Sequence, residues 1–522
     1  MAQKSRSRIP LKPLLPPPVA LAMTLLQQRG GDRRVKATMA MSLMAMSLIG
    51  TSLIAMSVMT SVVQGQAADS ARYATIDAYA MAALRAERVP GAALAVVHGD
   101  SIVHVRGFGS TTDGRAITGD TPFVIGSMSK PFTALAIMQL VEQGRVDLDA
   151  PAQQYLPWFR VADSVASRTI TVRHLLLHTS GIPRAADRAT GDDRTLVAHV
   201  RALQDVSLSN VPGKVHEYAS PNYLVLGAIV ETVTGVPFAT HVQREIFAPL
   251  GMSHSFTAQD AAMADGMATG HRYWFGFPRA ANLPHEHDRL PTAALISSAG
   301  DLARFMIAQR IGVLRDAPVL SSEGLLAMQS GGINAEGFAY GLGWRISQLH
   351  GVRAVHHGGI VPNFRGKMVM LPDSGWGVVV LTNASTSLPV PLTPTSHRIA
   401  DAIAASLVGV PLDSDGSRFR MVYWGILAGT LLIALGQLRS LFRLYRSRSP
   451  RPPRGSTIRA VLFDAAWVLF AALWLPGVAG ITWPEMFRGT PDMAWWLVLT
   501  LGLSTATVVV RAREMFRQSA AG

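Results

Sequence analysis

The pattern S-x-x-K occurs at Ser127 and Lys130, and an apolar run from 132 to 141 follows it directly. The run stops at Gly144 and predicts a buried helix, whose first turn would hold the serine hydroxyl and the lysine amine within hydrogen-bond reach. A serine becomes a nucleophile when a neighbouring base takes its proton, and a lysine in an apolar pocket favours the neutral form that can do so. The pattern therefore predicts covalent catalysis through Ser127. Because the chain has six lysines, the spacing alone is weak evidence.

Longer segments around this pattern resemble, in the expected order, those of the serine β-lactamase and penicillin-binding-protein family, in its class C or S12 peptidase branch. The run 120–134 resembles the entry to the family's active-site helix. The other matching segments are Leu175–Pro183, Pro212–Gly227, Pro249–Met252, Tyr340–Trp344, His357–Gly359 and Gly377–Asn383. The resemblance covers about residues 70–410. It implies an α/β (α+β) β-lactamase/transpeptidase-like domain, with an antiparallel sheet flanked by helices and an all-α subdomain.

The resemblance also implies the catalytic roles. Ser127 would be acylated, with Lys130 beside it as the second member of the S-x-x-K pair. Tyr218 matches the tyrosine of the family's Y-x-N element, and it would shuttle the proton during acylation and deacylation. A lone tyrosine is more often a packed aromatic, so this role depends on the place of Tyr218 within the ordered motifs.

The same resemblance predicts the residues that bind the substrate. His357 and Gly359 match the third element of the family, usually K-T-G or H-x-G, while the neighbouring His356 is expected to be an ordinary histidine. The backbone N–H groups of Ser127 and Ile360 would form the oxyanion hole. Asn363 is included among the binding residues, although the family often has glycine there.

One residue departs from the family pattern. Ser220 stands where the Y-x-N element has asparagine, so a hydroxyl replaces the amide that normally contacts substrate and lysine. The change disfavours efficient β-lactamase activity. It resembles peptidases that mature prodrugs by removing an acylated D-amino-acid leader, which also carry three C-terminal membrane helices. Val124 lies where such peptidases can carry an acidic residue, so a shared substrate does not follow.

Other polar residues are not assigned to chemistry. His178 and Ser180 belong to an H-T-S-G segment that we expect to stabilise a turn. The run 285–288, His-Glu-His-Asp, lacks a helical or strand spacing of metal ligands and is interpreted as a solvated loop. The chain has no cysteine and therefore no thiolate site or disulfide. We expect no metal and no cofactor.

Composition and hydropathy predict three parts. Only 16% of the residues are charged, which favours a chain partly in lipid. Residues 1–67 are expected to be a signal or anchor segment, with an uncharged stretch at 37–63 and a cleavage site after Ala67. Residues 68–412 are expected to be the hydrolase domain, and 413–522 a membrane domain with helices at about 421–438, 460–483 and 493–510.

Charge predicts the orientation. The loop 439–459 has seven arginines and no acid, and the tail after Val510 has three more arginines, whereas the loop 484–492 is nearly neutral. The positive-inside rule places the arginine-rich loop and the C-terminus in the cytoplasm, and the catalytic domain on the outer, periplasmic or extracellular side of the cytoplasmic (inner) membrane. The net charge of +14 comes mainly from arginines at the two ends, and no basic and aromatic pattern for nucleic acid lies between them.

Together these features predict a membrane-anchored serine hydrolase, most plausibly a peptidase for D-amino-acid-containing peptides or acylated prodrug leaders. An esterase, or a weak β-lactamase or D-Ala carboxypeptidase, would use the same residues. A catalytically silent ligand sensor is the alternative from another class. Membrane lipid and a small peptide, amide or ester are the expected partners, and a membrane transporter is a further candidate.

Overall fold

A computed structural model describes residues 33–187, 193–314, 317–335, 337–385, 393–413, 419–446, 454–470, 472 and 483–519. Its contacts divide the chain into two compact units, residues 1–75 and 76–522. Helix α2, Arg33–Ala86, begins in the first unit and ends in the second, where Ile76 and Ala80 are buried. The helix is continuous through Ala67, so cleavage after that residue stays a prediction, and the part of the N-terminal segment before Arg33 lies outside the described residues.

An antiparallel sheet of eight strands forms the centre of the second unit, in the order β2-β1-β14-β13-β12-β11-β10-β9. The strands are β1 (Gly91–His98), β2 (Ser101–Gly109), β9 (Ile333–Ala335), β10 (Phe338–Tyr340), β11 (Arg345–Leu349), β12 (Val352–Val361), β13 (Phe364–Leu371) and β14 (Trp376–Thr382). The first seven residues of β1 are buried. Their unbroken apolar run is therefore typical of a strand covered on both faces.

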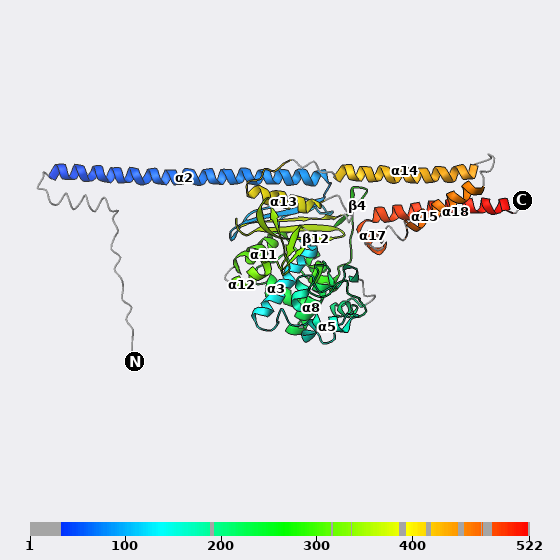
Figure 1. Ribbon diagram of the computed structural model, residues 1–522. Coiled ribbons are helices and arrows are strands. Elements are labelled where there is room, and N and C mark those ends of the chain that lie inside the picture. The colour runs from blue at the N-terminus through cyan, green and yellow to red at the C-terminus, as the bar shows by residue number, and fades with distance from the viewer. Residues whose placement is uncertain are drawn as a thin grey trace. The chain divides into compact units, whose positions relative to one another are not determined.

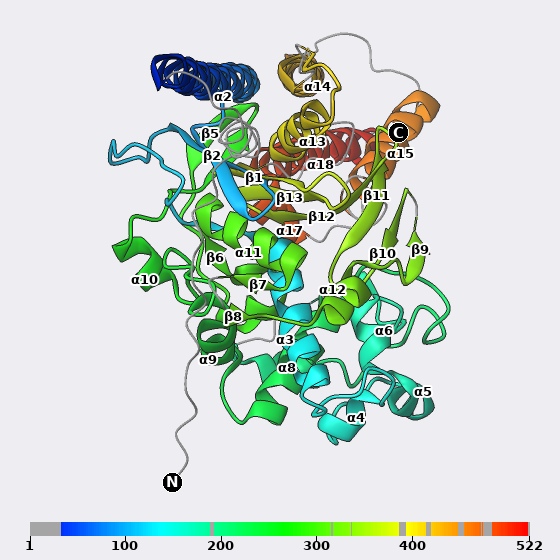
Figure 2. The ribbon, with the colours of Figure 1, turned by 90° about the vertical axis from the view of Figure 1, so that its left-hand side faces the viewer.

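Helices cover the two faces of this sheet. Helix α13, Thr395–Leu407, packs on β13 and β14 from one side, and α11, Ala299–Ile311, packs on β1 and β14 from the other (Figure 1). Figure 2 shows an α-helical part beyond α11, built around α3 and α8. The predicted antiparallel sheet with flanking helices and a helical subdomain is confirmed.

The helical part positions the S-x-x-K pattern. Its helices are α3 (Lys130–Glu142), α4 (Ala152–Tyr155), α5 (Ser164–Thr169), α6 (Val172–Leu176), α7 (Leu196–Arg201), α8 (Pro221–Thr234), α9 (Phe238–Val242), α10 (Gln259–Ala264) and α12 (Ser322–Gln329). Ten residues of α3 are buried, since it runs through the core and packs against α8. It ends just before Gly144, whose φ of +67° suits the left-handed residue that follows many helices.

Short strand pairs complete this unit: β3 (Phe123–Val124) with β6 (Ile296–Ser297), β4 (His271–Trp274) with β5 (Phe277–Ala280) and β15 (Ala384–Ser385), and β7 (Val313–Leu314) with β8 (Ala317–Pro318). Val124 pairs with Ile296 in the first of these.

The C-terminal region is helical, with α14 (Phe419–Arg446), α15 (Arg454–Leu469), α17 (Trp483–Gly489) and α18 (Pro491–Ser519). In the described part of the chain, α14 and α18 are long and apolar enough to cross a membrane. The bent pair of α8 with α9 and its extension to Phe247 also passes that test, although α8 lies in the core of the folded domain. The predicted span 460–483 begins within α15, and most of its remainder lies outside the described residues.

Candidate active site

Ser127 and Lys130 lie at the junction of a 3-10 turn and α3. The turn η1, Gly126–Ser129, holds the serine, and Lys130 is the first residue of α3. The Lys130 Nζ is 3.3 Å from Ser127 Oγ, so the predicted contact is present. Ser127 therefore lies in a tighter turn than the α-helical first turn that the spacing predicts.

Lys130 is fully buried, yet each of its three N–H bonds has an acceptor nearby. Besides Ser127, the Nζ donates to the Thr292 carbonyl at 3.0 Å and lies 3.5 Å from Ser220 Oγ. Thr292 belongs to the turn η5, Leu290–Ala294. All three acceptors are uncharged, and in the described part of the chain Lys130 forms no ion pair with an acid. No carboxylate among the described residues therefore holds the proton on the Lys130 amine, and the amine can exchange that proton with the Ser127 hydroxyl.

Tyr218 stands over this amine, just before α8 begins. The Lys130 Nζ is 5.0 Å from the centroid of the Tyr218 ring. The tyrosine hydroxyl is buried and, among the described residues, has no hydrogen-bond partner. Because buried polar atoms are nearly always paired, this hydroxyl is a group that only a bound substrate or water would complete.

His178 holds the segment that carries Tyr218. It is fully buried, and its Nδ1 accepts from the backbone N–H of Ala219 at 3.2 Å and from the Asn222 amide at 3.0 Å. Asn222 in turn accepts from Ser180 Oγ at 2.5 Å. The His178 ring lies 4.4 Å from the Tyr218 ring, centroid to centroid. This network supports the predicted structural role of His178 and Ser180 and extends it to the positioning of Tyr218.

His357 lies on β12 and is also fully buried. Its Nδ1 donates to the Gly358 carbonyl at 2.8 Å, so its Nε2 accepts from the Tyr340 hydroxyl at 3.2 Å. Burial, together with the positive charges of Arg345 and Lys130, lowers the pKa of His357 well below its ordinary value. His357 is therefore neutral, and both of its ring nitrogens form hydrogen bonds within the protein.

The next residues of β12 approach the nucleophile through the backbone. A Cβ on Gly359 would lie 1.8 Å from the Ile125 carbonyl oxygen, and one on Gly126 would lie 2.6 Å from the Ile360 nitrogen. Only glycine allows two backbones to come this close. The approach places the amide of Ile360 beside the turn of Ser127, which is the arrangement an oxyanion hole needs.

One predicted site residue is not part of this cluster. The Asn363 side-chain amide donates to the Ala281 carbonyl at 2.9 Å, and the Asn363 carbonyl accepts from the His271 N–H at 3.2 Å. Asn363 therefore ties the β12–β13 turn to the base of the β4–β5 hairpin. Its side-chain amide is thus engaged in a hydrogen bond that stabilises the fold.

Arg345 was not predicted, and it lies against the site. Its guanidinium carbon is 5.2 Å from the centroid of the Tyr218 ring and 4.8 Å from that of Phe338. The Arg345 Nε is buried, and in the described residues it has no partner. Arg345 directly follows the Y-G-L-G-W segment at Tyr340–Trp344, and a cation beside that motif was the available signal.

The His-Glu-His-Asp run at 285–288 makes contacts within the protein. His285 Nε2 donates to the Ala294 carbonyl at 2.7 Å, and Asp288 lies 3.0 Å from His199 in a buried pair. Within the described ranges, no group of three or more His, Asp or Glu side chains could hold a metal ion. The run anchors the segment that leads to Thr292.

The Ser127 hydroxyl, the buried Lys130 amine, the Tyr218 hydroxyl, which has no partner among the described residues, and the backbone of Ile360 beside the Ser127 turn are an arrangement suited to acyl transfer. The family model described as Beta-lactamase matches residues 76–401. Penicillin-binding protein 4 of Amycolatopsis lactamdurans is 34% identical over 328 residues, which cover 58% of this chain and 84% of that protein.

Two solved structures are similar to this chain. The octameric penicillin-binding protein homologue from Pyrococcus abyssi has a TM-score of 0.58 and 27% identity, over 67% of this chain and 80% of that one. The D-alanine carboxypeptidase AmpC from Burkholderia cenocepacia shares the fold, with a TM-score of 0.55 and 22% identity over 65% and 99% of the two chains. The chain thus belongs to the Beta-lactamase family and is a serine hydrolase of the penicillin-binding-protein type.

Proposed function

We propose that this chain is a membrane-anchored, extracytoplasmic peptidase that forms an acyl-enzyme at Ser127 with D-amino-acid-containing peptides, acylated prodrug leaders among them. The observation that carries the proposal is the Lys130 amine, which is buried between Ser127 and Ser220 and lies 5.0 Å from the centroid of the Tyr218 ring. These groups are arranged for proton transfer to and from the serine oxygen.

In this mechanism Ser127 Oγ attacks the substrate carbonyl carbon, and its proton passes to the Tyr218–Lys130 pair. The backbone N–H groups of Ser127 and Ile360 stabilise the negative oxygen of the tetrahedral intermediate. When the C–N bond breaks, the proton returns to the leaving amine and an ester remains on Ser127. A water molecule then gives a proton to the same pair and its oxygen bonds to the ester carbon; the bond from that carbon to Ser127 Oγ breaks, the acid product leaves, and the proton returns to Oγ.

Charge supports an anionic group on the substrate. Lys130 and Arg345 both contact Tyr218, and among the described residues neither forms an ion pair with an acid. An arginine with an unpaired buried Nε fits a carboxylate, which it can bind through two parallel hydrogen bonds. A peptide with a carboxylate near the scissile bond would therefore complete the site.

The proposed orientation follows from charge and helix order. Helices α14 and α18, together with the span predicted at 460–483, would cross the membrane, with the arginine-rich loop 439–459 and the C-terminus in the cytoplasm. The end of the catalytic domain before α14 would then lie outside. A membrane transporter that delivers or removes the peptide is a candidate partner in this arrangement.

Labelling with a fluorophosphonate or β-lactam probe tests the nucleophile. We expect the full chain to label and the Ser127→Ala variant not to label. Ser129→Ala is the matched control, because the Ser129 hydroxyl donates to the Gly126 carbonyl at 2.8 Å and has no part in the proposed chemistry. Equal labelling of Ser127→Ala and the unchanged chain would refute the assignment.

Four substrates separate the remaining functions. An N-acyl-D-asparaginyl amide, a D-alanyl dipeptide, a p-nitrophenyl ester and nitrocefin report on leader peptidase, carboxypeptidase, esterase and β-lactamase activity. We expect the two D-amino-acid peptides to be hydrolysed fastest. Fastest turnover of the ester would favour an esterase, and peptide binding without turnover or labelling would favour a silent sensor.

A further inference from the structure

The β4–β5 hairpin, His271–Ala280, meets helices of the C-terminal region at three places. Its turn packs on the start of α14, its first strand reaches α17, and its backbone reaches the start of α18. In the orientation proposed above, these helix ends all lie on the outer side of the membrane, where the catalytic domain also lies. The contacts of the hairpin and the arginine pattern of the loops therefore support the same arrangement, in which the hairpin and these helix ends lie on the outer side of the membrane.

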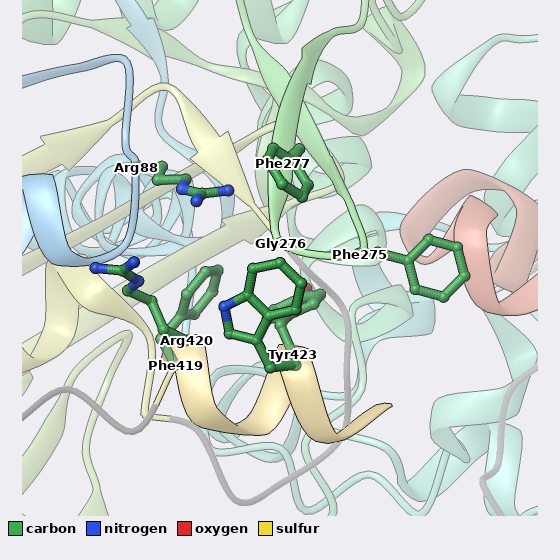
Figure 3. A pocket seen from close by; sticks show the side chains of 8 residues that line it. Arg88, Phe275, Gly276, Phe277, Phe419, Arg420 and Tyr423 are labelled. Atoms are coloured by element: carbon green, nitrogen blue, oxygen red, sulfur yellow. The ribbon is translucent and has the colours of Figure 1, made fainter. Parts of the chain in front are cut away.

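Aromatic side chains form the contact with α14, and Figure 3 shows two of them, Phe419 and Tyr423, on that helix near the hairpin turn at Gly276. Tyr273 of the hairpin packs against Phe419 at 4.9 Å and Tyr423 at 5.9 Å between ring centroids, and all three rings are buried. Gly276 lies so close that a Cβ there would be 3.0 Å from the Tyr423 Cβ. The turn is therefore fitted to this helix.

Arg272 makes the contact with α17. Its Nη1 donates to the carbonyls of Phe487 and Arg488, at 3.1 and 3.0 Å. These are the last carbonyls of a helix that ends at Gly489, and they have no partner within the helix itself. The Arg272 guanidinium provides hydrogen-bond donors for these carbonyls, and its positive charge matches the negative C-terminal end of the α17 dipole.

The contact with α18 uses an unusual turn residue. Phe275 and Gly276, which join the two strands, have φ values of +48° and +80°. Two-residue hairpin turns of this kind favour asparagine or glycine, and a bulky side chain is sterically disfavoured in this conformation. The Phe275 N–H donates to Asp492 Oδ2 at 2.8 Å, and Asp492 is buried. A phenylalanine at a position that turn geometry disfavours indicates a role outside the turn.

The hairpin also connects to β12, which carries Ile360 of the proposed oxyanion hole and is called the oxyanion strand here. The His271 N–H donates to the carbonyls of Asn363 and Asn383, and the Asn363 amide donates to the Ala281 carbonyl. Asn363 lies three residues after Ile360, in the turn that ends β12. A displacement of the hairpin would therefore reach the backbone beside Ser127.

We propose that the β4–β5 hairpin is the docking element that holds the catalytic domain on the outer ends of α14, α17 and α18, and that this docking braces the oxyanion strand. Arg272 and Asp492 are its anchors, and Phe275 is its contact residue. In this proposal the membrane helices help to position the oxyanion strand of the hydrolase. The inference rests on the proposed membrane orientation and, for its effect on catalysis, on the proposed role of Ser127.

Cysteine cross-linking tests the docking without any activity measurement, because the chain has no cysteine of its own. We expect the pair Phe275→Cys and Asp492→Cys, in the full chain in nanodiscs, to form a disulfide that mass spectrometry finds in a non-reduced digest. The matched control joins Arg279→Cys, an exposed position on β5, to the same Asp492→Cys. Equal yields from the two pairs would overturn the docking.

Kinetics of the full chain test the bracing. Arg272→Ala should lower kcat for a small ester about fivefold and leave KM unchanged, because a small misplacement of the reacting groups slows the chemical step. Arg272→Lys, which can still donate to the end of α17, should recover most of that loss. Phe275→Asn suits an isolated turn better, so it should lower kcat while the chain stays folded. Unchanged kcat in Arg272→Ala and Phe275→Asn would refute the bracing and leave the assignment of Ser127 intact.

Discussion

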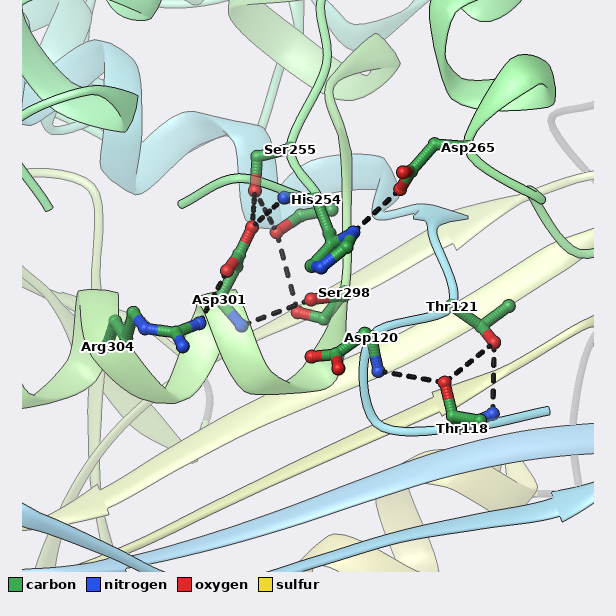
Figure 4. A network of polar contacts seen from close by, with 10 residues as sticks. Thr118, Asp120, Thr121, His254, Ser255, Asp265, Ser298, Asp301 and Arg304 are labelled. Atoms are coloured by element: carbon green, nitrogen blue, oxygen red, sulfur yellow. Dashed lines mark hydrogen bonds and ion pairs between the residues drawn. The ribbon is translucent and has the colours of Figure 1, made fainter. Parts of the chain in front are cut away.

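Two polar clusters of the catalytic domain differ in how completely their atoms are paired. Around Asp301 the groups satisfy one another (Figure 4): its carboxylate accepts from the His254 N–H and the Ser255 hydroxyl at 2.7 and 2.8 Å and pairs with Arg304 at 2.7 Å. Around Tyr218, buried atoms of neighbouring residues have no partner in the described structure. These atoms are His178 Nε2, His216 Nε2, Tyr218 OH and Arg345 Nε.

The difference distinguishes a structural network from a site. Unpaired buried polar atoms are expensive, so a cluster of them persists where a ligand or a reaction supplies the missing partners. Asp301 is fully buried in the first turn of α11, and its contacts fasten the segment 254–255 to that helix. The same residue types thus fasten the fold in one cluster and, in the proposed mechanism, serve chemistry in the other.

The largest expected effect comes from removing one unpaired atom. Tyr218→Phe deletes only the hydroxyl, and we expect kcat/KM to fall about 10²–10⁴-fold, as for loss of a general acid–base. The free energy of unfolding should stay the same or rise, because a buried group without a partner is removed. Steady-state kinetics and chemical denaturation measure the two quantities.

Tyr223→Phe is the matched control for that variant. The Tyr223 hydroxyl donates to the Leu176 carbonyl at 3.0 Å, so its removal should lower stability by about 1 kcal/mol and preserve most of the activity. If both variants lost activity equally, the contrast between unpaired and paired hydroxyls would have no functional meaning.

The second prediction concerns the satisfied cluster. Asp301→Ala leaves the His254 N–H, the Ser255 hydroxyl and Arg304 without their acceptor, and we expect a loss of about 3 kcal/mol of stability. Chemical denaturation of the full chain in detergent measures the loss. Folded Asp301→Ala protein should still label at Ser127 at low temperature. A stable protein that fails to label would place this cluster in the active site.

The third prediction concerns Arg345. Arg345→Ala should raise KM for a carboxylate-bearing D-peptide about tenfold, because a charged hydrogen bond to the substrate is lost, and should change KM for an uncharged ester little. Arg353→Ala is the control, since Arg353 donates to the Gln329 carbonyl at 2.8 Å. Equal effects on both substrates would mean that Arg345 supports Tyr218 and does not bind a carboxylate.

The fourth prediction concerns the dependence of stability on pH. Burial lowers the pKa of His178, His357 and His397 well below 6.5, so the folded protein keeps them neutral while the unfolded chain binds protons. Their contribution to stability is therefore complete above pH 6.5 and is lost as pH falls below that value.

Denaturation at pH 8 and pH 5 tests this. His397→Gln should reduce the difference in stability between the two conditions, whereas replacement of the exposed His350 should leave it unchanged. A protein equally stable at both pH values would contradict the neutral state of these histidines.

The sequence predicts the features that depend on local spacing. Ser127 and Lys130 are three residues apart in one turn, and the apolar runs of β1 and β14 are strands in a covered sheet. The Thr292 carbonyl could not be predicted, because it is a backbone atom 162 residues from Lys130 and any residue type could supply it. Asn363 was assigned to the substrate by its place in the motif, whereas its amide is used by Ala281, 82 residues earlier.

The close approach of η1 and β12 has a consequence for variation among relatives of this chain. Gly126 and Gly359 touch no substrate in the proposed mechanism, yet a side chain on either would push two backbones apart and widen the oxyanion hole. Exchange is limited by space at Gly359, and by both space and a φ of +58° at Gly126, so even alanine should be rejected at either position. Ser220, which does border the reacting groups, has no such limit, and a lineage could change its substrates there while both glycines stay fixed.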